Sequence, residues 1–293
     1  MKSGNIRKAA IFGNSFQDPH LEYVALLLNS LSDAGIDVMI EESFMSYLAA
    51  NAISNPAWRS VLAPDAAGTG VVISLGGDGT FLRAAEWVAD RRIPVLGVNS
   101  GHLGFLANYT PEEAPSLVAD LLHGNLEVES RMLLKVDARN IPEGVWPYAL
   151  NEVAFLKEDS SSMINVRTGI DNYYLTDYQA DGLLISTPTG STAYNLSAGG
   201  PILQPTLECW LLSPVAPHSL TMRPLAVSAS STVSTVTVSR SGFFRLSIDG
   251  RSFPLPSGSE VKVTRAPFPL LVMRRRSDDF ASTLRKKLSW GQR

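Results

Sequence analysis

Cysteine and long hydrophobic runs are scarce in this sequence of 293 residues. The single cysteine, Cys209, has no partner for an internal disulfide, which excludes the class of small secreted domains held together by disulfides. No apolar stretch approaches the roughly 20 residues that a membrane-spanning helix requires. The N-terminal segment "MKSGNIRKAAIFGNS" has too short an apolar run for a secretory signal peptide. We therefore expect a cytoplasmic protein that does not interact with membranes.

Strong charge of either sign is also lacking. A net charge of -3 and a pI near 5.8 give no electrostatic reason to expect nucleic acid or an anionic membrane as a partner. With 45% hydrophobic and 18% charged residues, the composition is typical of a globular protein. The length is sufficient for two domains, each with its own core. These features favour a protein that acts on small molecules.

The first 125 residues alternate patterns of buried strands with patterns of helices, which predicts a parallel sheet. Apolar runs predict strands at 8–13, 36–42, 70–76 and 93–99. A helical face is formed by Leu21, Val24, Leu27, Leu28 and Leu31, with Gly35 as the expected stop. A second helix is predicted over 80–92 and a third after Thr110, where Thr110, Pro111 and Glu113 form a capping box.

From about Leu126 the chain changes to short runs rich in Val, Ser and Thr that are separated by Gly or Pro. Examples are "LLKVDAR", "STVSTVTVSR" and "SEVKVTR", which are typical of a β-sandwich. The final segment returns to a helical pattern, with Asp278 as the expected N-cap. We therefore predict a Rossmann-like α/β domain at 1–125, a β-rich domain at 126–277, and a C-terminal helix in 278–293 that returns to the first domain.

One carboxylate, Asp78, stands among Gly76, Gly77 and Gly79 where a buried strand ends and a helix begins. Such a turn presents backbone N–H groups and the positive end of a helix dipole at the edge of the sheet, which favours phosphate binding. A carboxylate repels phosphate, so Asp78 would either bind a cation or accept a proton from a hydroxyl nucleophile. The alternative is that Asp78 caps the helix that begins at Thr80. The dinucleotide fingerprint and the Walker lysine pattern are both absent.

A second polar segment, "DGLLISTPTGSTAYNLSAGGPIL", runs from Asp181 to Leu203. It follows a buried strand with a loop rich in Thr, Ser and Gly, and it becomes apolar again at "PIL". A loop held close to packed structure in this way is typical of a binding loop. A structural turn is the alternative.

The two segments together resemble the NAD kinase family, and the resemblance covers nearly the whole chain. The "GGDGT" turn is shared with lipid kinases and phosphofructokinases, whereas "TPTGSTAY" followed by "GGPI" is far more specific. The matching motifs, in order, are "GGDGT" (76–80), "NSGHLGFL" (99–106), "LNE" (150–152), the 181–203 segment, "PHSLTMRPL" (217–225), "DG" (249–250) and "LRKKLSWG" (284–291).

The resemblance implies a cytoplasmic enzyme that transfers the terminal phosphoryl group of ATP to the adenosine ribose 2′-hydroxyl of NAD, giving NADP and ADP. It further implies a divalent metal cofactor, with Mg²⁺ expected, whose protein ligands are unknown. A homodimer or homotetramer is implied as well. Asp78 is the implied catalytic carboxylate, and Gly76, Gly77, Gly79 and Thr80 form the phosphate loop. The residues implied to bind NAD are Asp78, Gly79, Arg83, Asn151, Glu152, Asp181, Thr192, Ala193, Tyr194, Asn195, Leu196 and Ser197.

Several of these residues also have plainer interpretations. Exposure at the start of a strand would explain Asn151 and Glu152, and Tyr194 could belong to the core beside Leu196. Arg83 could reach a phosphate or could be an ordinary exposed helix arginine.

Among the remaining charged and titratable residues, Lys286 and Lys287 are interpreted as complementing a helix dipole. His102 and His218 have no partner spacing that suggests a metal site.

The sequence departs from the family pattern at two positions. Gln179 stands where some bacterial members have arginine, so a direct charge contact there is not expected. Arg251 follows the "DG" pair where some relatives have Gln or Asn, and it could approach a phosphate or a neighbouring subunit. Two other classes of protein remain as alternatives: a lipid kinase that shares the GGDGT turn, and a dinucleotide-binding regulator without activity.

Overall fold

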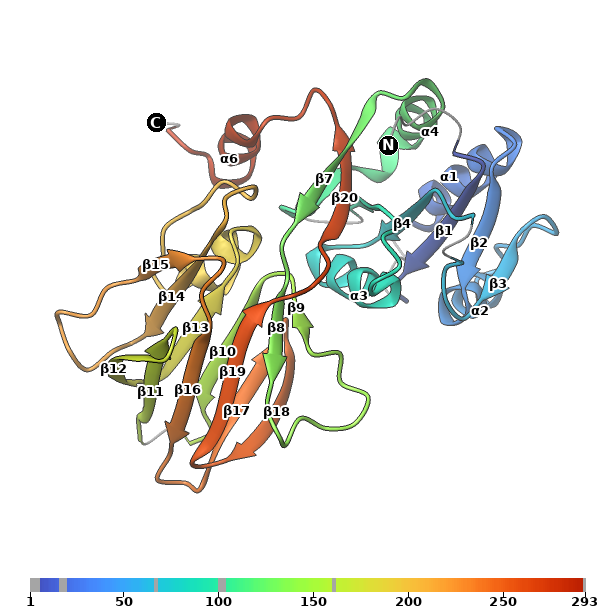
Figure 1. Ribbon diagram of the computed structural model, residues 1–293. Coiled ribbons are helices and arrows are strands. Elements are labelled where there is room, and N and C mark those ends of the chain that lie inside the picture. Colours follow the sequence, from blue (N-terminus) through green and yellow to red (C-terminus); the bar gives the residue numbers. More distant parts are fainter. Residues whose placement is uncertain (1–5, 16–19, 66–67, 100–103, 160–161, 292–293) are drawn as a thin grey trace. The chain divides into compact units, whose positions relative to one another are not determined.

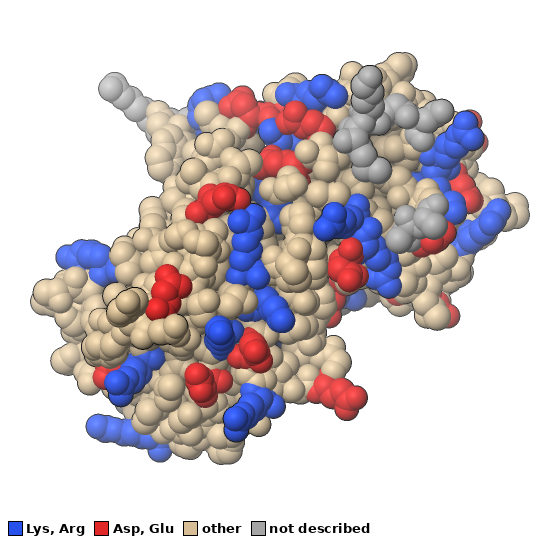
Figure 2. Space-filling model, viewed as in Figure 1, with Lys and Arg blue, Asp and Glu red and all other residues tan. Residues whose placement is uncertain are grey.

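The computed structural model describes residues 6–15, 20–65, 68–99, 104–159 and 162–291. The chain folds into two compact units (Figure 1). Unit 1 comprises Met1–Ser130 and Leu270–Arg293, and unit 2 comprises Arg131–Pro269. Acidic and basic side chains are interspersed on the face drawn in Figure 2.

Unit 1 is an α/β unit, as predicted. In the described residues its sheet has eight strands in the order β3-β2-β1-β4-β5-β20-β7, with β6 paired to β5. Its elements are β1 Lys8–Gly13, α1 Leu21–Asp33, β2 Asp37–Glu41, α2 Glu42–Ala50, β3 Arg59–Val61, β4 Val71–Leu75, α3 Asp78–Val88, β5 Val95–Val98, β6 Ala107–Tyr109, η2 Pro111–Glu113, α4 Ala114–His123, β7 Leu126–Arg131, β20 Leu270–Arg275 and α6 Phe280–Leu288.

The central strands of unit 1 run parallel and are buried on both faces. β1 pairs with β2 and β4, and β4 pairs with β5, all in parallel. Ala9 and Ile11 join the core cluster under α1 and α4, whereas Ala10 and Phe12 point to the opposite face because side chains alternate along a strand. Helix α3 packs near β1, β4 and β5. The continuous apolar runs of these strands follow from this double coverage.

Unit 2 contains two antiparallel sheets, which confirms the predicted β-rich domain. The strand orders are β15-β14-β13-β10-β17-β18 and β12-β11-β16-β19-β8-β9. Its elements are β8 Leu134–Asp137, β9 Tyr148–Ala149, β10 Glu152–Lys157, β11 Ile164–Ile170, β12 Tyr173–Ala180, β13 Gly182–Ser186, η3 Thr189–Thr192, α5 Tyr194–Ser197, β14 Cys209–Val215, β15 Leu225–Ser228, β16 Val233–Val238, β17 Phe243–Ile248, β18 Arg251–Pro256 and β19 Ser259–Arg265. One core cluster takes residues from both sheets, among them Phe155 and Trp210 of the first and Val166 and Val263 of the second. Two sheets around one core form a sandwich.

The units divide at different residues from the predicted domains, 1–125 with 278–293 and 126–277. The difference arises because β7 and β20 are strands of the unit 1 sheet. Their sequences, "LEVESR" and "LLVMRR", resemble the short strands of the β-rich half, so composition alone does not separate them.

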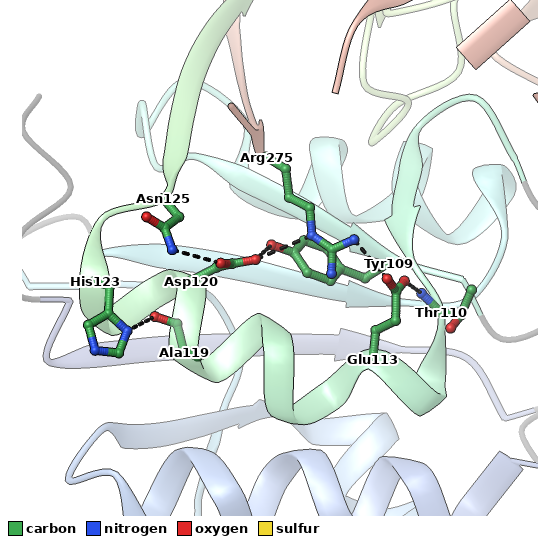
Figure 3. A network of polar contacts seen from close by, with 8 residues as sticks. All are labelled: Tyr109, Thr110, Glu113, Ala119, Asp120, His123, Asn125 and Arg275. Carbon is green, nitrogen blue, oxygen red and sulfur yellow. Dashed lines mark hydrogen bonds and ion pairs between the residues drawn. The ribbon is translucent and has the colours of Figure 1, made fainter. Parts of the chain in front are cut away.

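The C-terminal segment returns to unit 1, as expected, and a partly buried polar network holds its strand there (Figure 3). The Arg275 guanidinium pairs with Glu113 at 2.7 Å and with Asp120 at 3.2 Å. Its Cζ lies 3.9 Å from the centre of the Tyr109 ring, and the Tyr109 hydroxyl donates to Asp120 at 2.8 Å. Burial first, and then the bond to Asp120, raises the pKa of Tyr109.

Two helices begin at different residues from those predicted. The Glu113 carboxylate accepts a hydrogen bond from the Thr110 N–H at 2.9 Å, which is one half of the predicted capping box, but the turn there is the 3-10 helix η2 and α4 follows it. The prediction that Asp278 caps the last helix is wrong by one residue. Asp279 is the N-cap of α6, because its carboxylate accepts from the Ser282 N–H at 2.8 Å.

Candidate active site

The GGDGT turn connects β4 to α3 in unit 1. Gly76 has φ +149°, and a Cβ there would lie 2.3 Å from the Thr80 hydroxyl oxygen, so only glycine fits. Among the described residues, no atom lies within 4 Å of the Cβ positions of Gly77 and Gly79. The predicted phosphate loop therefore has one glycine that the fold requires and two that border open space beside the helix N-terminus.

Thr80 is buried, and its hydroxyl accepts a hydrogen bond from the Asn14 side-chain amide at 3.1 Å. The turn is thereby tied to the end of β1. Thr80 stabilises the turn from inside.

The Asp78 carboxylate accepts two backbone hydrogen bonds, from Phe105 at 2.9 Å and from Leu106 at 3.0 Å. A Cβ at residue 104 would lie 1.9 Å from an Asp78 carboxylate oxygen, so Gly104 permits this close approach. Asp78 is the first residue of α3, and the N-cap is Gly77, which has no side chain. The helix-cap interpretation of Asp78 is therefore wrong: its carboxylate is oriented by a segment 27 residues away.

Two positively charged residues of unit 1, Arg83 and Lys287, could influence the electrostatics of this turn. Arg83 is exposed on α3, with its Cζ 5.4 Å from the centre of the Phe12 ring, so its contact with a phosphate stays a prediction. Lys287 lies in the last turn of α6, where a lysine complements the helix dipole, but its ammonium is shielded from solvent. Burial lowers the pKa of Lys287 to about 8, and the charges of Asp78 and Asp278 oppose that shift.

In unit 2, the turn before β10 is held by Asp249, whose role could not be predicted from the sequence. The Asp249 carboxylate accepts backbone hydrogen bonds from Leu150 at 2.6 Å, Asn151 at 2.8 Å and Glu152 at 3.0 Å. Asp249 and Gly250 form the two-residue turn between β17 and β18, with φ +46° and +82°. An Asp-Gly pair between two strands signals a hairpin, but it does not reveal what the carboxylate binds.

Asn151 and Glu152 are largely buried, which contradicts exposure as their explanation. Asn151 is 8% exposed, and its carbonyl accepts from the Thr187 N–H at 2.9 Å. Burial is the largest cause that raises the pKa of Glu152 to about 8, followed by the charge of Asp249, while the Tyr194 N–H opposes the shift. Glu152 is therefore largely protonated at neutral pH.

The polar loop after β13 folds back on this turn. The Thr187 hydroxyl donates to the Leu150 carbonyl at 2.5 Å and accepts from the Gly190 N–H at 3.0 Å. The Ser191 hydroxyl accepts from the Leu203 N–H at 2.9 Å. Most of the loop's hydroxyl groups thus stabilise its shape.

The predicted NAD-binding run from Thr192 to Ser197 contains both exposed and buried side chains. Tyr194 is 39% exposed, so its interpretation as a core residue is wrong. Ser197 is exposed, and Thr192, Ala193 and Leu196 are half-buried.

Asn195, in contrast, is fully buried. Its amide nitrogen donates to the carbonyls of Ser191 at 3.0 Å and Pro201 at 3.1 Å, and its oxygen accepts from Ser213 at 2.6 Å. The Asn195 side chain therefore holds the loop, and any contact of residue 195 with NAD would involve its backbone.

Asp181 lies away from Asn151 and Glu152 within unit 2. Its carboxylate pairs with the Lys157 ammonium at 2.8 Å, at the opposite end of β10 from Glu152. At about 3.3 Å per residue, the two ends are about 16 Å apart. The structure therefore gathers residues 150–152 and 187–197 and separates Asp181 from them.

The two positions that depart from the family pattern are both anchored within unit 2. The Gln179 carbonyl accepts from the His218 N–H at 2.9 Å. The Arg251 guanidinium donates to the Tyr148 carbonyl at 2.6 Å, and its Cζ lies 5.4 Å from the centre of the Trp146 ring. His102 lies outside the described residues.

Two further observations concern the expected metal cofactor and the possibility of a membrane-spanning helix. Within the described ranges, no group of three or more His, Cys, Asp or Glu residues could hold a metal ion. No helix of the described chain is long and apolar enough to cross a membrane.

Comparisons with known proteins find matches to the same family in both units. Models of the ATP-NAD kinase N-terminal and C-terminal domains match residues 10–126 and 150–275. The NAD kinase of Porphyromonas gingivalis is 42% identical over 287 residues, covering 98% of this chain and 99% of that protein. The NAD kinase of Bacteroides fragilis is 41% identical over 286 residues, covering 97% and 98%.

Two solved structures have a similar fold. A yeast NADH kinase in complex with NADH has a TM-score of 0.85 at 24% identity and covers 98% of this chain and 89% of that one. An NAD kinase from Archaeoglobus fulgidus in complex with ATP has a TM-score of 0.72 at 24% identity, covering 96% and 97%. With relatives this similar over nearly its whole length, the chain belongs to the ATP-NAD kinase family.

Proposed function

We propose that this protein is an NAD kinase, a phosphotransferase that moves the terminal phosphoryl group of ATP to the adenosine ribose 2′-hydroxyl of NAD. Family membership and relatives named NAD kinase support this reaction. The single structural observation that supports it best is the Asp78 carboxylate. It stands at the N-terminus of α3, between two glycines that border open space, and two backbone N–H groups fix its orientation.

In this proposal the turn binds phosphate and Asp78 acts as the general base. The helix N-terminus attracts the phosphates, and Gly77 and Gly79 allow them to approach the backbone. Asp78 takes the proton from the ribose 2′-hydroxyl as its oxygen forms a bond to the terminal phosphorus. The bond from that phosphorus to the bridging oxygen breaks, and ADP leaves with the electron pair.

We further propose that Asn151, Glu152 and the 192–197 run bind NAD in unit 2. The protonated Glu152 can donate a hydrogen bond, while its second oxygen is buried without a hydrogen-bond partner among the described residues. Tyr194 offers an exposed aromatic face to a base. Asp181, already paired with Lys157, would contribute at a different part of the dinucleotide.

The expected metal cofactor is Mg²⁺ bound chiefly to ATP. Mg²⁺ commonly keeps several waters and binds through substrate phosphates and one or two carboxylates, so a site without a cluster of acidic residues in the described chain suits it. When bound, it neutralises charge on the phosphates. We also propose a cytoplasmic homodimer or homotetramer, because short strands with open edges, such as β15, need covering.

The proposal is tested with purified protein, ATP, Mg²⁺ and NAD, coupled to an NADP-specific dehydrogenase. Parallel reactions with labelled ATP offer diacylglycerol or a sphingoid base as the acceptor. We expect label in NADP only. Labelled lipid with unlabelled NAD would support the lipid kinase instead. Binding of NAD without any transfer would support the regulator.

A further inference from the structure

Helix α6 brings a lysine of unusual burial to the GGDGT turn. Arg285 and Lys286 are exposed, as expected near the end of a helix, whereas Lys287 is half-buried and its ammonium is shielded from solvent. Among the described residues, none accepts a hydrogen bond from that ammonium. A buried charge without such a partner is costly, so its position calls for an explanation in addition to the helix dipole.

The Lys287 ammonium lies 5.2 Å from the centre of the Phe105 ring. This is the geometry of a cation–π contact, which is strongest where water is excluded. The Asp78 carboxylate is close enough to favour the charged form of Lys287, and with a pKa of about 8 the lysine remains mostly protonated at neutral pH. The positive charge therefore lies against an aromatic ring and within electrostatic reach of two carboxylates, Asp78 and Asp278.

Phe105 links the lysine to Asp78 through its backbone. Its N–H donates to one Asp78 carboxylate oxygen at 2.9 Å, and the N–H of Leu106 donates to the other at 3.0 Å. Any contact that fixes the Phe105 ring also fixes the donor that orients the carboxylate.

Helix α6, which carries Lys287, has no fully buried residue and follows the anchored strand β20. β20, just before α6, is held by Arg275 through its ion pairs with Glu113 and Asp120 (Figure 3). A cavity of about 270 Å³ lies beside this anchor. It is lined by residues of α6, among them Ser282, Lys286 and Lys287, and by Ala107, Thr110 and Glu113. The ion pairs of Arg275 therefore fix the strand from which the chain continues into α6.

We propose that Lys287 is a positioning residue for the phosphoryl transfer: packed on Phe105, its ammonium holds the 105–106 segment that aims the Asp78 carboxylate. The charge also offsets the repulsion between that carboxylate and incoming phosphates. This inference rests on the proposed kinase function. It predicts that loss of the charge lowers kcat and leaves the affinity for NAD nearly intact.

The test compares Lys287→Met with Lys286→Met in the full-length enzyme. Methionine keeps the length and apolar packing of lysine and removes its charge. The exposed neighbour Lys286 controls for the helix dipole, because both variants remove one charge from the last turn. Because misplacement of a catalytic group by about 1 Å can cost about a hundredfold, we expect Lys287→Met to lose at least about tenfold in kcat. The KM for NAD and the melting temperature should change little, and Lys286→Met should stay within about twofold.

A second variant tests the route through the ring. Phe105→Leu keeps the backbone N–H and removes the aromatic face, so it should lower kcat in the same direction. The kcat of the double variant should then be no lower than that of the more impaired single variant, because both substitutions remove the same contact between Lys287 and the Phe105 ring.

The possible outcomes are distinguishable. If the wild-type enzyme makes no NADP, the proposed function fails first. If it is active and Lys287→Met keeps kcat within about twofold, or if the losses of Lys287→Met and Phe105→Leu multiply, only the positioning role is overturned. A Lys286→Met variant as impaired as Lys287→Met would also overturn it.

Discussion

The GGDGT turn of unit 1 and the 187–200 loop of unit 2 have similar compositions, but their side chains are arranged in opposite ways. In the turn, Gly77 and Gly79 border open space, and the one carboxylate is oriented by backbone groups from another segment. In the loop, the side chains of Thr187, Ser191 and Asn195 are buried and bonded to the protein itself.

This difference separates two uses of glycine and hydroxyl residues. The turn leaves room for a ligand, whereas the hydroxyl and amide groups of the loop give it a fixed shape. Substitutions at the open positions of the turn should therefore lower activity with little loss of stability, and substitutions of the buried loop side chains should lower stability first.

The largest effect is expected at Asp78. Loss of a general base costs roughly 10²–10⁴-fold in rate, or about 3–5 kcal/mol of barrier. Asp78→Asn should therefore lower kcat at least about a hundredfold, while the affinity for NAD, measured by calorimetry, stays within a few fold. Added Mg²⁺ should not restore activity.

The structure adds a control to this experiment. An asparagine keeps only one acceptor for the two N–H groups of Phe105 and Leu106, so a loss of about 1 kcal/mol in stability is expected as well. The exposed Asp90, two residues beyond α3, gives a matched Asp90→Asn control that should keep wild-type activity. Restoration of Asp78→Asn by high Mg²⁺ would favour a cation-binding role, and an unchanged kcat would refute the base.

The next largest effect is expected at Asn195, on stability. Asn195→Ala leaves the buried Ser191 carbonyl, the Pro201 carbonyl and the Ser213 hydroxyl without their partner, which should cost about 2–3 kcal/mol. For a domain of this size that lowers the melting temperature by about 5–10 °C. Exposed Asn140 supplies a matched Asn140→Ala control. A variant with unchanged stability and lost NAD binding would mean that the side chain contacts the ligand.

The effect of Glu152 on stability should depend on pH. Because its pKa is raised to about 8, the folded protein keeps this proton up to that pH, whereas the unfolded chain loses it near 4.5. The contribution of Glu152 to stability therefore falls as pH rises from about 4.5 to 8 and is constant above that range.

Replacement of Glu152 by Gln removes this pH dependence. Relative to wild type, Glu152→Gln should gain up to about 3 kcal/mol in unfolding free energy between pH 5.5 and pH 8.5. Melting curves at both pH values, without substrates, measure the change. Exposed Glu143, replaced in the same way, should show no such trend. A parallel response of wild type and Glu152→Gln would contradict the raised pKa.

Much of the fold could be predicted from local patterns. The alternation of apolar runs and helical faces located β1, α1, β2, β4, α3 and β5, because each pattern depends on residues close in sequence. In β16 the pattern was less informative. Val233, Thr235 and Thr237 are buried, while Val238 is 54% exposed, so the core face there is shared by valine and threonine and is not marked by valine alone.

The organisation of the site depends on contacts between distant segments, which local patterns do not contain. Asp249 lies 97–99 residues from the N–H groups that it accepts from, and the partners of Asp78 are 27 and 28 residues away. Lys287 stands beside Lys286 in a helix with charged neighbours, so its burial could not be read from its own segment. The burial of Asn195 could not be predicted either, because its polar neighbours in the sequence suggest an exposed loop.

The smallest effect on stability is expected at Gly79, and a comparison with Gly76 distinguishes the roles of the two glycines. Gly79 lies in the first turn of α3, and among the described residues nothing contacts its Cβ position. Alanine is favoured over glycine in helices by up to about 1 kcal/mol, so Gly79→Ala should keep or slightly raise the melting temperature. If phosphate approaches the backbone here, the same methyl group should lower kcat/KM about tenfold, equivalent to about 1.4 kcal/mol.

Gly76→Ala is the matched comparison, because its methyl group would meet Thr80 and its φ of +149° is unfavourable for alanine. That variant should lose about 1–3 kcal/mol in stability whatever its effect on activity. Melting temperature and kcat/KM should be measured together for both variants. We expect Gly79→Ala to lower kcat/KM without lowering the melting temperature, and Gly76→Ala to lower the melting temperature. If Gly79→Ala proved fully active, the open space beside α3 would not be where phosphate approaches, and the resemblance of the turn to a phosphate loop would rest on Asp78 alone.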